Sequence, residues 1–167
     1  SGRAPVTYAD AAEFQKLSRE LDARIKSHVN DPSRTVSFRP AAGTTWWLDR
    51  AFNGKYLGKS GGYLPWRNFD EGYFDPRAYA GVSTAAFLEI SGKHAVCSRC
   101  RHIMCTRSAR VEGKPYAAAG VRPEFETIAL WINCCITDRD AIFYMNHLCN
   151  DLGIDTMTAG SVMSGAM

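Results

Sequence analysis

Three cysteines within nine residues constrain this chain more than any other feature of its sequence. Cys97, Cys100 and Cys105 follow the spacing C-x2-C-x4-C. Thiolates are soft ligands that select iron–sulfur clusters, zinc or copper(I). A two-residue gap lets both sulfurs of a turn reach one centre, and the third cysteine is near enough to join them. The sequence therefore predicts that these three side chains hold a metal centre.

Three ligands are one short of a closed site, whether that site holds an iron–sulfur cluster or structural zinc. Zinc would need a fourth local ligand, for which His94 and His102 are the obvious choices. A cluster can instead take its fourth ligand from another part of the protein. A zinc-stabilised interaction module and a redox protein are both open at this point.

The surroundings of the three cysteines are electropositive, since residues 94–110 include Arg and His side chains but no acidic one. Positive charge lowers the pKa of a thiol and offsets the negative charge of a thiolate cluster, although a solvated basic loop has the same composition. The net charge of the whole chain, +3, is too small to favour a nucleic-acid partner. The basic residues and histidines concerned are His94, Arg99, Arg101, His102, Arg107 and Arg110.

The other three cysteines, Cys134, Cys135 and Cys149, fall on predicted helices, where a buried core cysteine is the common outcome. The adjacent pair at 134 and 135 offers the alternative of a thiolate near a metal. Free thiols and metal ligands without a secretory context favour a reducing compartment, so we expect a cytoplasmic protein. No stretch approaches the roughly 18 apolar residues that span a bilayer.

Helical periodicity dominates the chain. Apolar residues at spacings of three and four predict a helix over residues 11–29, and a shorter one follows at 45–52. Further helices are predicted from the cap Ser83 to Glu89, from near Pro123, and from the cap Thr137 to Gly153; a last helix begins after Asp155 or Thr156. Strand signals are weak, and the best of them lies at 35–38. The predicted fold is mainly α, an orthogonal helical bundle with long irregular loops.

We treat residues 1–167 as a single helical domain that contains one long loop, residues 54–81, rich in glycine and aromatic residues. Loops of this length in a compact domain are usually functional, and the aromatic content suggests that this one wraps a partner. The chain opens on Ser1-Gly2-Arg3 with no initiator methionine. We therefore expect a fragment of a larger, multidomain enzyme.

Several motifs occur in an order that resembles the aldehyde:ferredoxin oxidoreductase family. Gly43-Thr44 and the stretch 64–69, Leu-Pro-Trp-Arg-Asn-Phe, come first; the cysteine trio follows. Then come Pro-Glu-Phe-Glu-Thr at 123–127 and Asn-His-Leu-Cys-Asn-Asp-Leu-Gly-Ile-Asp-Thr at 146–156. The resemblance covers residues 35–167 and places the chain in the middle domain of that family.

The resemblance implies a tungsten or molybdenum ion bound by two pterins, with a 4Fe-4S cluster nearby. Such enzymes oxidise aldehydes to carboxylic acids and pass the electrons to ferredoxin. It also implies that Cys97, Cys100 and Cys105 are three of the four cluster ligands, and that the fourth comes from another domain of the same chain. Ferredoxin or an electron-transfer subunit is then the expected partner, in a homo-oligomer with no nucleic acid and no membrane span.

The same resemblance assigns the remaining site residues. The family's pterin motif falls on Asn150, Gly153, Ile154 and Asp155, and its active-site glutamate falls on Glu126, with Glu124 as the other choice. Other roles for these positions stay open, since Asp155 also suits an N-cap and a glutamate at 126 suits the first turn of a helix.

Three positions depart from the family pattern. The gap between Cys100 and Cys105 is one residue longer than usual, Asn150 replaces an aspartate, and Phe125 replaces a tyrosine. An amide still accepts a hydrogen bond but brings no charge. These changes indicate a divergent member, and some relatives in the family reduce aromatic thioesters instead of oxidising aldehydes.

Overall fold

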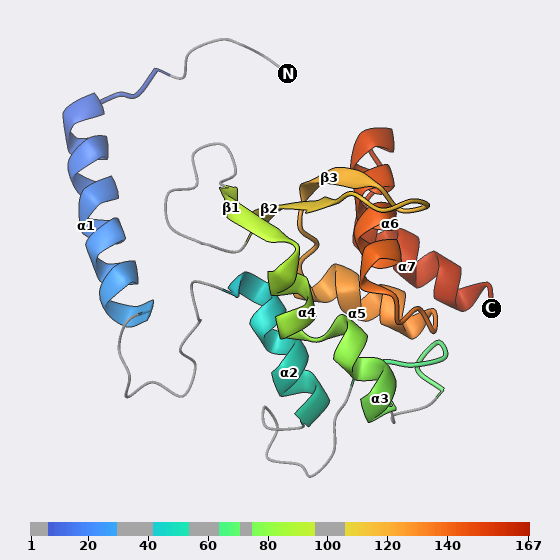
Figure 1. Ribbon diagram of the computed structural model, residues 1–167. Coiled ribbons are helices and arrows are strands. Elements are labelled where there is room, and N and C mark those ends of the chain that lie inside the picture. Colours follow the sequence, from blue (N-terminus) through green and yellow to red (C-terminus); the bar gives the residue numbers. More distant parts are fainter. Residues whose placement is uncertain (1–6, 30–41, 54–63, 71–74, 96–105) are drawn as a thin grey trace.

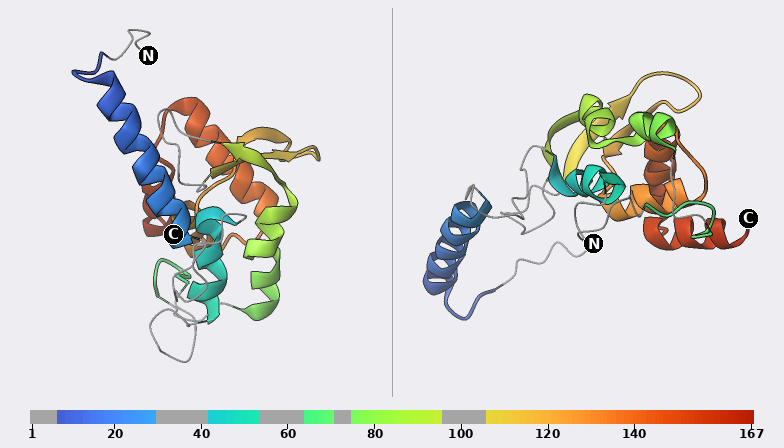
Figure 2. Two further views of the ribbon diagram at one scale, coloured as in Figure 1. Left: turned by 90° about the vertical axis from the view of Figure 1, so that its left-hand side faces the viewer. Right: turned by 90° about the horizontal axis from the view of Figure 1, so that it is seen from below.

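The structure, a computed structural model, describes residues 7–29, 42–53, 64–70, 75–95 and 106–167 (Figure 1). Most of the described residues lie in helices, so the predicted mainly α fold is confirmed. Figures 1 and 2 show that α6 crosses α5 and α7 instead of running parallel to them. The helices, including two short 3-10 helices η1 and η2, are α1 (Ala11–Val29), η1 (Gly43–Thr45), α2 (Trp46–Asn53), α3 (Pro76–Tyr79), η2 (Ala80–Val82), α4 (Thr84–Glu89), α5 (Phe125–Asn133), α6 (Arg139–Leu152) and α7 (Thr156–Gly165).

Helix α1 has the predicted bounds, and Asp10 caps it. The Asp10 carboxylate accepts hydrogen bonds from the backbone N–H groups of Ala12 and Glu13, both at 2.9 Å. This satisfies amide donors that have no partner within the first turn. The apolar face of α1 is only half covered, since Phe14, Leu17 and Leu21 are each about half exposed. In Figures 1 and 2, α1 stands apart from the other helices.

The carboxylate of Asp49 on α2 joins α2 to the segment that contains α3 and α4. It accepts hydrogen bonds from the Tyr79 hydroxyl and from the Thr84 backbone N–H, the latter at 3.2 Å. Burial and the neighbouring Asp49 carboxylate raise the pKa of Tyr79 far above its ordinary range. The ring of Tyr79 stacks on Phe52 with 3.8 Å between ring centroids. Together these contacts fix α2 against α3 and α4.

The end of the predicted long loop, 54–81, is helical, because α3 and the start of η2 lie there. The Asp75 side chain caps α3 by accepting from the Arg77 backbone N–H, and Pro76 occupies the first helical position. Residues 54–63 and 71–74 of that loop lie outside the described residues.

A small antiparallel sheet was not predicted. Its three strands, in the order β1-β2-β3, are β1 (Ser91–Ala95), β2 (Thr106–Val111) and β3 (Ala118–Val121). These strands contain mainly Ala, Gly, Ser and charged residues instead of the branched and aromatic residues that favour strands. The sheet is anchored by tertiary packing, since Ala109 and Val111 pack against the fully buried Phe143 of α6. The strand expected at 35–38 lies outside the described residues.

Helices α5, α6 and α7 are the last three elements of the chain. Helix α5 begins at Phe125, two residues after Pro123, because Glu124 takes the N-cap position. Helix α6 is capped by Asp138 and not by Thr137, since the Asp138 carboxylate accepts from the N–H groups of Asp140 and Ala141. Gly153 ends α6 with φ 69°, the left-handed conformation predicted for it.

The main core lies between α2, α4, α5 and α6. Its largest side chains are aliphatic or aromatic and almost fully buried, and each contributes roughly 1.5–3 kcal/mol by leaving water. They are Leu48, Leu64, Val82, Phe87, Ile128, Ile132 and Ile142.

Helices α5 and α7 approach each other closely at Gly160. A Cβ atom built on Gly160 would lie 2.8 Å from Leu130 Cβ and 3.3 Å from the Leu130 carbonyl carbon. The Cys134 thiol, which packs at the same place, donates to the Gly160 carbonyl oxygen at 3.4 Å. Only a residue without a side chain therefore allows the two backbones to meet here.

We expect Gly160→Ala to destabilise the protein by about 1–3 kcal/mol, because the added methyl group forces α7 away from Leu130. Gly165→Ala is the matched control: it lies on the same helix, and its Cβ would meet nothing within 4 Å. The measurement is the midpoint of thermal unfolding followed by circular dichroism. A midpoint for Gly160→Ala that equals or exceeds that of the control would contradict the close approach.

Candidate functional site

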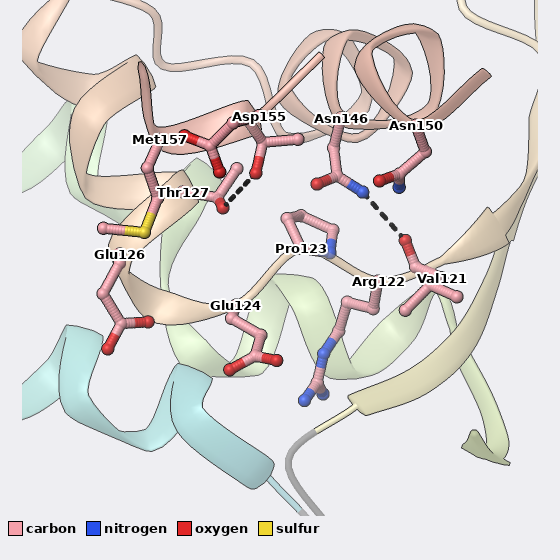
Figure 3. A pocket seen from close by; sticks show the side chains of 11 residues that line it. Val121, Arg122, Pro123, Glu124, Glu126, Thr127, Asn146, Asn150, Asp155 and Met157 are labelled. Carbon is pink, nitrogen blue, oxygen red and sulfur yellow. Dashed lines mark hydrogen bonds between the residues drawn. The ribbon is translucent and has the colours of Figure 1, made fainter. Parts of the chain in front are cut away.

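A pocket of about 520 Å³ opens where the segment after β3 meets the N-terminal ends of α5 and α7 and the side of α6 (Figure 3). It brings together four of the site residues predicted from the sequence. Its lining consists of Val121, Arg122, Pro123, Glu124, Glu126, Thr127, Asn146, Asn150, Asp155, Thr156 and Met157.

Two side-chain hydrogen bonds connect the elements that line the pocket. The Asn146 side-chain amide donates to the Val121 carbonyl oxygen at 3.0 Å, which ties the segment to α6. The hydroxyl groups of Thr127 on α5 and Thr156 on α7 are 3.0 Å apart and share a hydrogen bond. The walls of the pocket are therefore fixed by hydrogen bonds between α5, α6 and α7.

The N-terminus of α5 is capped by a residue distant in the sequence. Glu124 occupies the N-cap position, but its side chain makes no capping hydrogen bond. Instead the hydroxyl oxygen of Thr44, in η1, accepts from the Phe125 backbone N–H at 3.2 Å. Because Thr44 caps the helix, the Glu124 carboxyl group is not needed as a cap and lies in the pocket. The same contact joins η1 to the N-terminus of α5.

Arg122 is a buried cation beside the pocket, only 1% exposed. Its guanidinium donates to the Ala42 carbonyl oxygen at 2.7 Å and to the Ser91 hydroxyl at 3.2 Å. In Figure 3 the guanidinium lies on the same side of the α5 N-terminus as the Glu124 carboxyl group. Arg122 thus connects the pocket to the segment before η1 and to the first residue of β1.

The two glutamates have different surroundings. Burial, followed by the nearby charge of Glu126, raises the pKa of the half-buried Glu124 carboxyl group above its ordinary value. The Thr44 hydroxyl and the Arg122 cation oppose this shift without cancelling it. Glu126 lies in the first turn of α5, as the interpretation from helix electrostatics predicts. A carboxyl group whose pKa is raised by burial binds a proton more readily than an exposed one, so Glu124 is a candidate for proton transfer.

The predicted pterin motif is divided by the structure. Asn150 and Asp155 line the pocket, whereas Gly153 and Ile154 do not. Gly153 provides the left-handed turn between α6 and α7, and Ile154 is 49% exposed.

The alternative role of Asp155 as an N-cap is confirmed. Its Oδ2 atom accepts from the Thr158 backbone N–H at 2.7 Å and from the Thr158 hydroxyl at 2.6 Å. These hydrogen bonds lower the pKa of Asp155. Its other oxygen, Oδ1, makes no hydrogen bond within the part of the chain that the structure describes, so the cap leaves one acceptor for a ligand.

Cys97, Cys100 and Cys105 lie outside the described residues, but the strands on either side of them are described. Strands β1 and β2 pair antiparallel, and their last registered pair is Ala95 with Thr106. The chain therefore enters and leaves the cysteine-bearing segment at neighbouring positions. Across the described ranges, no group of three or more His, Cys, Asp or Glu side chains is arranged to hold a metal ion.

The prediction that the remaining cysteines are core residues holds for two of them. Cys134 and Cys149 are buried, and Cys135 is partly exposed. Burial raises the pKa of the Cys134 and Cys149 thiols, which keeps both in the neutral form.

Sequence reasoning missed several residues that build the pocket. Arg122 carries no local signal, because its partners at 42 and 91 are distant in the sequence. Thr44 was noted within the Gly-Thr motif and Asn146 within the 146–156 stretch, but neither was given a role. Separately from the pocket, no helix in the described ranges is both long and apolar enough to cross a bilayer.

Comparison with known proteins gives the wider context. Residues 20–167 match the family model described as "Aldehyde ferredoxin oxidoreductase, domains 2 & 3". A tungsten-containing aldehyde ferredoxin oxidoreductase of Thermococcus kodakarensis is 30% identical over 168 residues, and one of Pyrococcus furiosus is 29% identical over 167 residues. These alignments cover 100% and 99% of this chain and 25% of each relative.

A third relative with the same description, from Pyrococcus abyssi, is also 29% identical over 167 residues. The chain spans about a quarter of the length of these relatives. The family match covers most of the chain, including both strands that flank the cysteine trio and every residue of the pocket. The chain belongs to the aldehyde ferredoxin oxidoreductase family, and its match lies in the part of the family described as domains 2 & 3.

Proposed function

We propose that this chain is part of a tungsten-pterin, iron–sulfur oxidoreductase that converts aldehydes to carboxylic acids and passes the electrons to ferredoxin. The observation that carries the proposal is the pocket in which Glu124 and Glu126 lie with Asn150 and Asp155, in a member of this family. The relatives' descriptions as tungsten-containing aldehyde ferredoxin oxidoreductases support the choice of metal and substrate.

The polar groups of the pocket fit a pterin. A pterin ring presents amine and amide donors, which need acceptors. Asn150 offers a carbonyl oxygen and Asp155 offers Oδ1 from the end of the pocket where α6 gives way to α7 (Figure 3). We propose that Asn150 and Asp155 hold the pterin, while Gly153 and Ile154 shape the turn between them. Tungsten, or molybdenum, bound by two pterins would supply the two-electron oxidation of the substrate carbon.

The cysteine trio is the proposed site of a 4Fe-4S cluster. Thiolates are the ligands that such clusters require, and Cys97, Cys100 and Cys105 supply three of four. The pairing of Ala95 with Thr106 holds the two ends of their segment together, which favours convergence of the three sulfurs. The fourth ligand is proposed to come from another domain of the full-length polypeptide.

The residues of this chain then have defined tasks. Oxidation of an aldehyde with water yields a carboxylic acid, two protons and two electrons. Glu124 accepts a proton released from water or substrate, and its raised pKa makes its carboxylate a stronger base than that of an ordinary glutamate. Thr44 and Arg122 orient the Glu124 carboxyl group, and Glu126 tunes its proton affinity through charge. A 4Fe-4S cluster held in part by Cys97, Cys100 and Cys105 would supply a one-electron path from the site to ferredoxin.

The test uses the full-length protein, purified without oxygen. Elemental analysis should give tungsten or molybdenum together with four iron atoms and four sulfides per polypeptide, as expected for one 4Fe-4S cluster. Aldehydes should reduce a viologen dye only when the full-length protein is present. Zinc without iron, together with unfolding by a chelator, would instead identify a zinc-stabilised module and refute the proposal. If the protein reduced an aromatic thioester and oxidised no aldehyde, the proposed cofactors would stand and the proposed substrate would be replaced.

Further expectations concern the assembly. The proposed partners are the other domains of its own polypeptide, a ferredoxin or electron-transfer subunit, and a second copy of the enzyme in a homo-oligomer. The segment alone should be inactive, since the fourth cluster ligand is proposed to come from another domain. We propose a cytoplasmic location, because exposed iron–sulfur clusters and free thiols persist best in a reducing compartment.

A further inference from the structure

Positive charge is concentrated in one short part of the chain. From residue 91 to residue 114 the sequence has six Lys or Arg side chains and one acidic side chain, Glu112. The rest of the chain has 14 basic and 16 acidic side chains, so it carries a small excess of negative charge. The basic side chains within the described part of this segment are Lys93, Arg107, Arg110 and Lys114.

A β-bulge in β1 contains one of these basic residues, the exposed Lys93. Ser91 pairs with Ala109 and His94 pairs with Arg107, so Gly92 and Lys93 together stand opposite Ser108. Such a bulge re-aims the side chains of the strand that contains it. A Cβ on Gly92 would lie 2.7 Å from the Ser108 hydroxyl oxygen, and that hydroxyl donates to the Lys93 carbonyl oxygen at 3.1 Å. The bulge is therefore built closely around Ser108, with Lys93 beside it.

The outer face of the hairpin formed by β1 and β2 is open. On β2, Ser108 and Arg110 are exposed, whereas Ala109 and Val111 point the other way and pack on α6. A hollow of about 440 Å³ lies on this sheet, lined in part by Gly92, Ser108, Arg110 and Gly120. Small side chains thus leave room for a partner's surface, and the basic side chain of Arg110 lies at this hollow.

Acidic groups nearby leave most of this positive charge uncompensated. Glu89, at the edge of the hollow, pairs with Arg139 at 2.8 Å. Glu112 pairs with Arg110 at 3.0 Å, but both side chains are more than 70% exposed, and such pairs are weak enough for a partner's carboxylate to compete. Among the described residues, Lys93 and Lys114 have no acidic side chain within salt-bridge distance.

The same hairpin leads directly into the cysteine trio. Strand β1 ends at Ala95, two residues before Cys97, and β2 begins at Thr106, next to Cys105. An acceptor docked on this face would therefore bind on the strands that carry the proposed cluster. Complementary charge between such surfaces steers association and fixes orientation.

We propose that the outer face of the β1–β2 hairpin, centred on Lys93 and Arg110, is the docking surface for a small acidic iron–sulfur protein of the ferredoxin class. The proposal rests on the proposed function, because it names where the electron acceptor of that reaction binds. Each docked acceptor takes one electron from the cluster and is itself reduced by one electron, so two acceptors are consumed for each aldehyde oxidised.

The test compares two double variants of the full-length holoenzyme. Lys93→Glu with Arg110→Glu reverses charge on the docking surface. Lys16→Glu with Arg77→Glu makes the same change in net charge on α1 and α3, whose side chains are exposed and lie away from the sheet (Figure 1). Aldehyde oxidation is measured at low salt with ferredoxin and with a viologen dye, and the Kd of oxidised ferredoxin is measured by calorimetry.

The hairpin variant should lower kcat/KM for ferredoxin and weaken its Kd by about tenfold or more, with a flatter salt dependence. Viologen reduction by this variant should match the wild type, as should both readouts of the control variant. An unchanged Kd for ferredoxin, an equal loss in the control, or an equal loss with viologen would each overturn the proposal.

Two further outcomes distinguish acceptor docking from nucleic-acid binding and from a failure of the proposed function. Loss of binding to a short DNA duplex, with the Kd for ferredoxin unchanged, would identify a nucleic-acid surface and overturn the proposal. If wild-type enzyme reduces no viologen with any aldehyde, the proposed function fails. The calorimetric Kd still decides whether this face binds the acidic protein.

Discussion

Replacement of Glu124 by glutamine is expected to lower kcat for aldehyde oxidation by about 10²–10⁴-fold, the usual contribution of a general base. The amide keeps the shape of the side chain and the contact with Thr44 but cannot accept a proton. KM for the aldehyde should change little, because the substitution removes a group that acts mainly in the transition state. The measurement is steady-state kinetics of the full-length enzyme with a viologen acceptor.

The pH profile identifies which glutamate is the base. A base must be ionised, so kcat/KM of the wild type should fall as pH decreases through the Glu124 pKa. Because burial and Glu126 raise that pKa, the fall should begin at a higher pH than an ordinary glutamate would give. Glu124→Gln should abolish this limb. Glu126→Gln should move it to lower pH, since it removes a neighbouring negative charge.

Two results would contradict this assignment. If Glu126→Gln lost as much activity as we expect for Glu124→Gln, while Glu124→Gln stayed active, Glu126 would be the base, as the family resemblance first suggested. The matched control is Glu112→Gln, an exposed glutamate after β2 that lies outside the pocket. A similar loss in this control would mean that the effect does not arise in the pocket.

The helices could be predicted because their signals are local. Apolar spacing in α1, the cap Ser83 before α4 and the left-handed Gly153 after α6 each depend on residues within a few positions. Boundaries moved by one or two residues where two side chains compete for one cap, as Thr137 and Asp138 do. The sheet could not be predicted, because small and charged residues become strands only when Phe143 covers one face.

The pocket was predicted in part for the same reason. Glu124, Glu126, Asn150 and Asp155 belong to two short motifs, and the structure places them along one cavity. No rule of sequence spacing predicts that Thr44 caps a helix that begins 81 residues later, or that Arg122 reaches Ala42. The pKa of Glu124 depends first on its burial and on Glu126, and then on Thr44 and Arg122, which oppose the shift. The burial and the two opposing contacts come from the fold, so they are visible only in three dimensions.

Replacement of Cys100 by serine is expected to remove most of the iron and sulfide from the full-length protein and to abolish electron transfer to ferredoxin. A serine hydroxyl is a hard, weakly acidic ligand and cannot replace a thiolate on iron. Cys100 is the middle one of the three proposed ligands, and the ends of their segment are held together by the pairing of Ala95 with Thr106. The strands should persist without the cluster, because Ala109 and Val111 remain packed on Phe143.

Cys135→Ser is the matched control, since Cys135 is a partly exposed free thiol at the end of α5 and away from the hairpin. It should keep its iron, its brown colour and the electron paramagnetic resonance signal of the reduced cluster. The measurement is iron and sulfide per polypeptide together with that signal. Full iron content in Cys100→Ser, or loss of iron in Cys135→Ser, would show that the cluster is not held by the hairpin and would remove the electron path proposed for this enzyme.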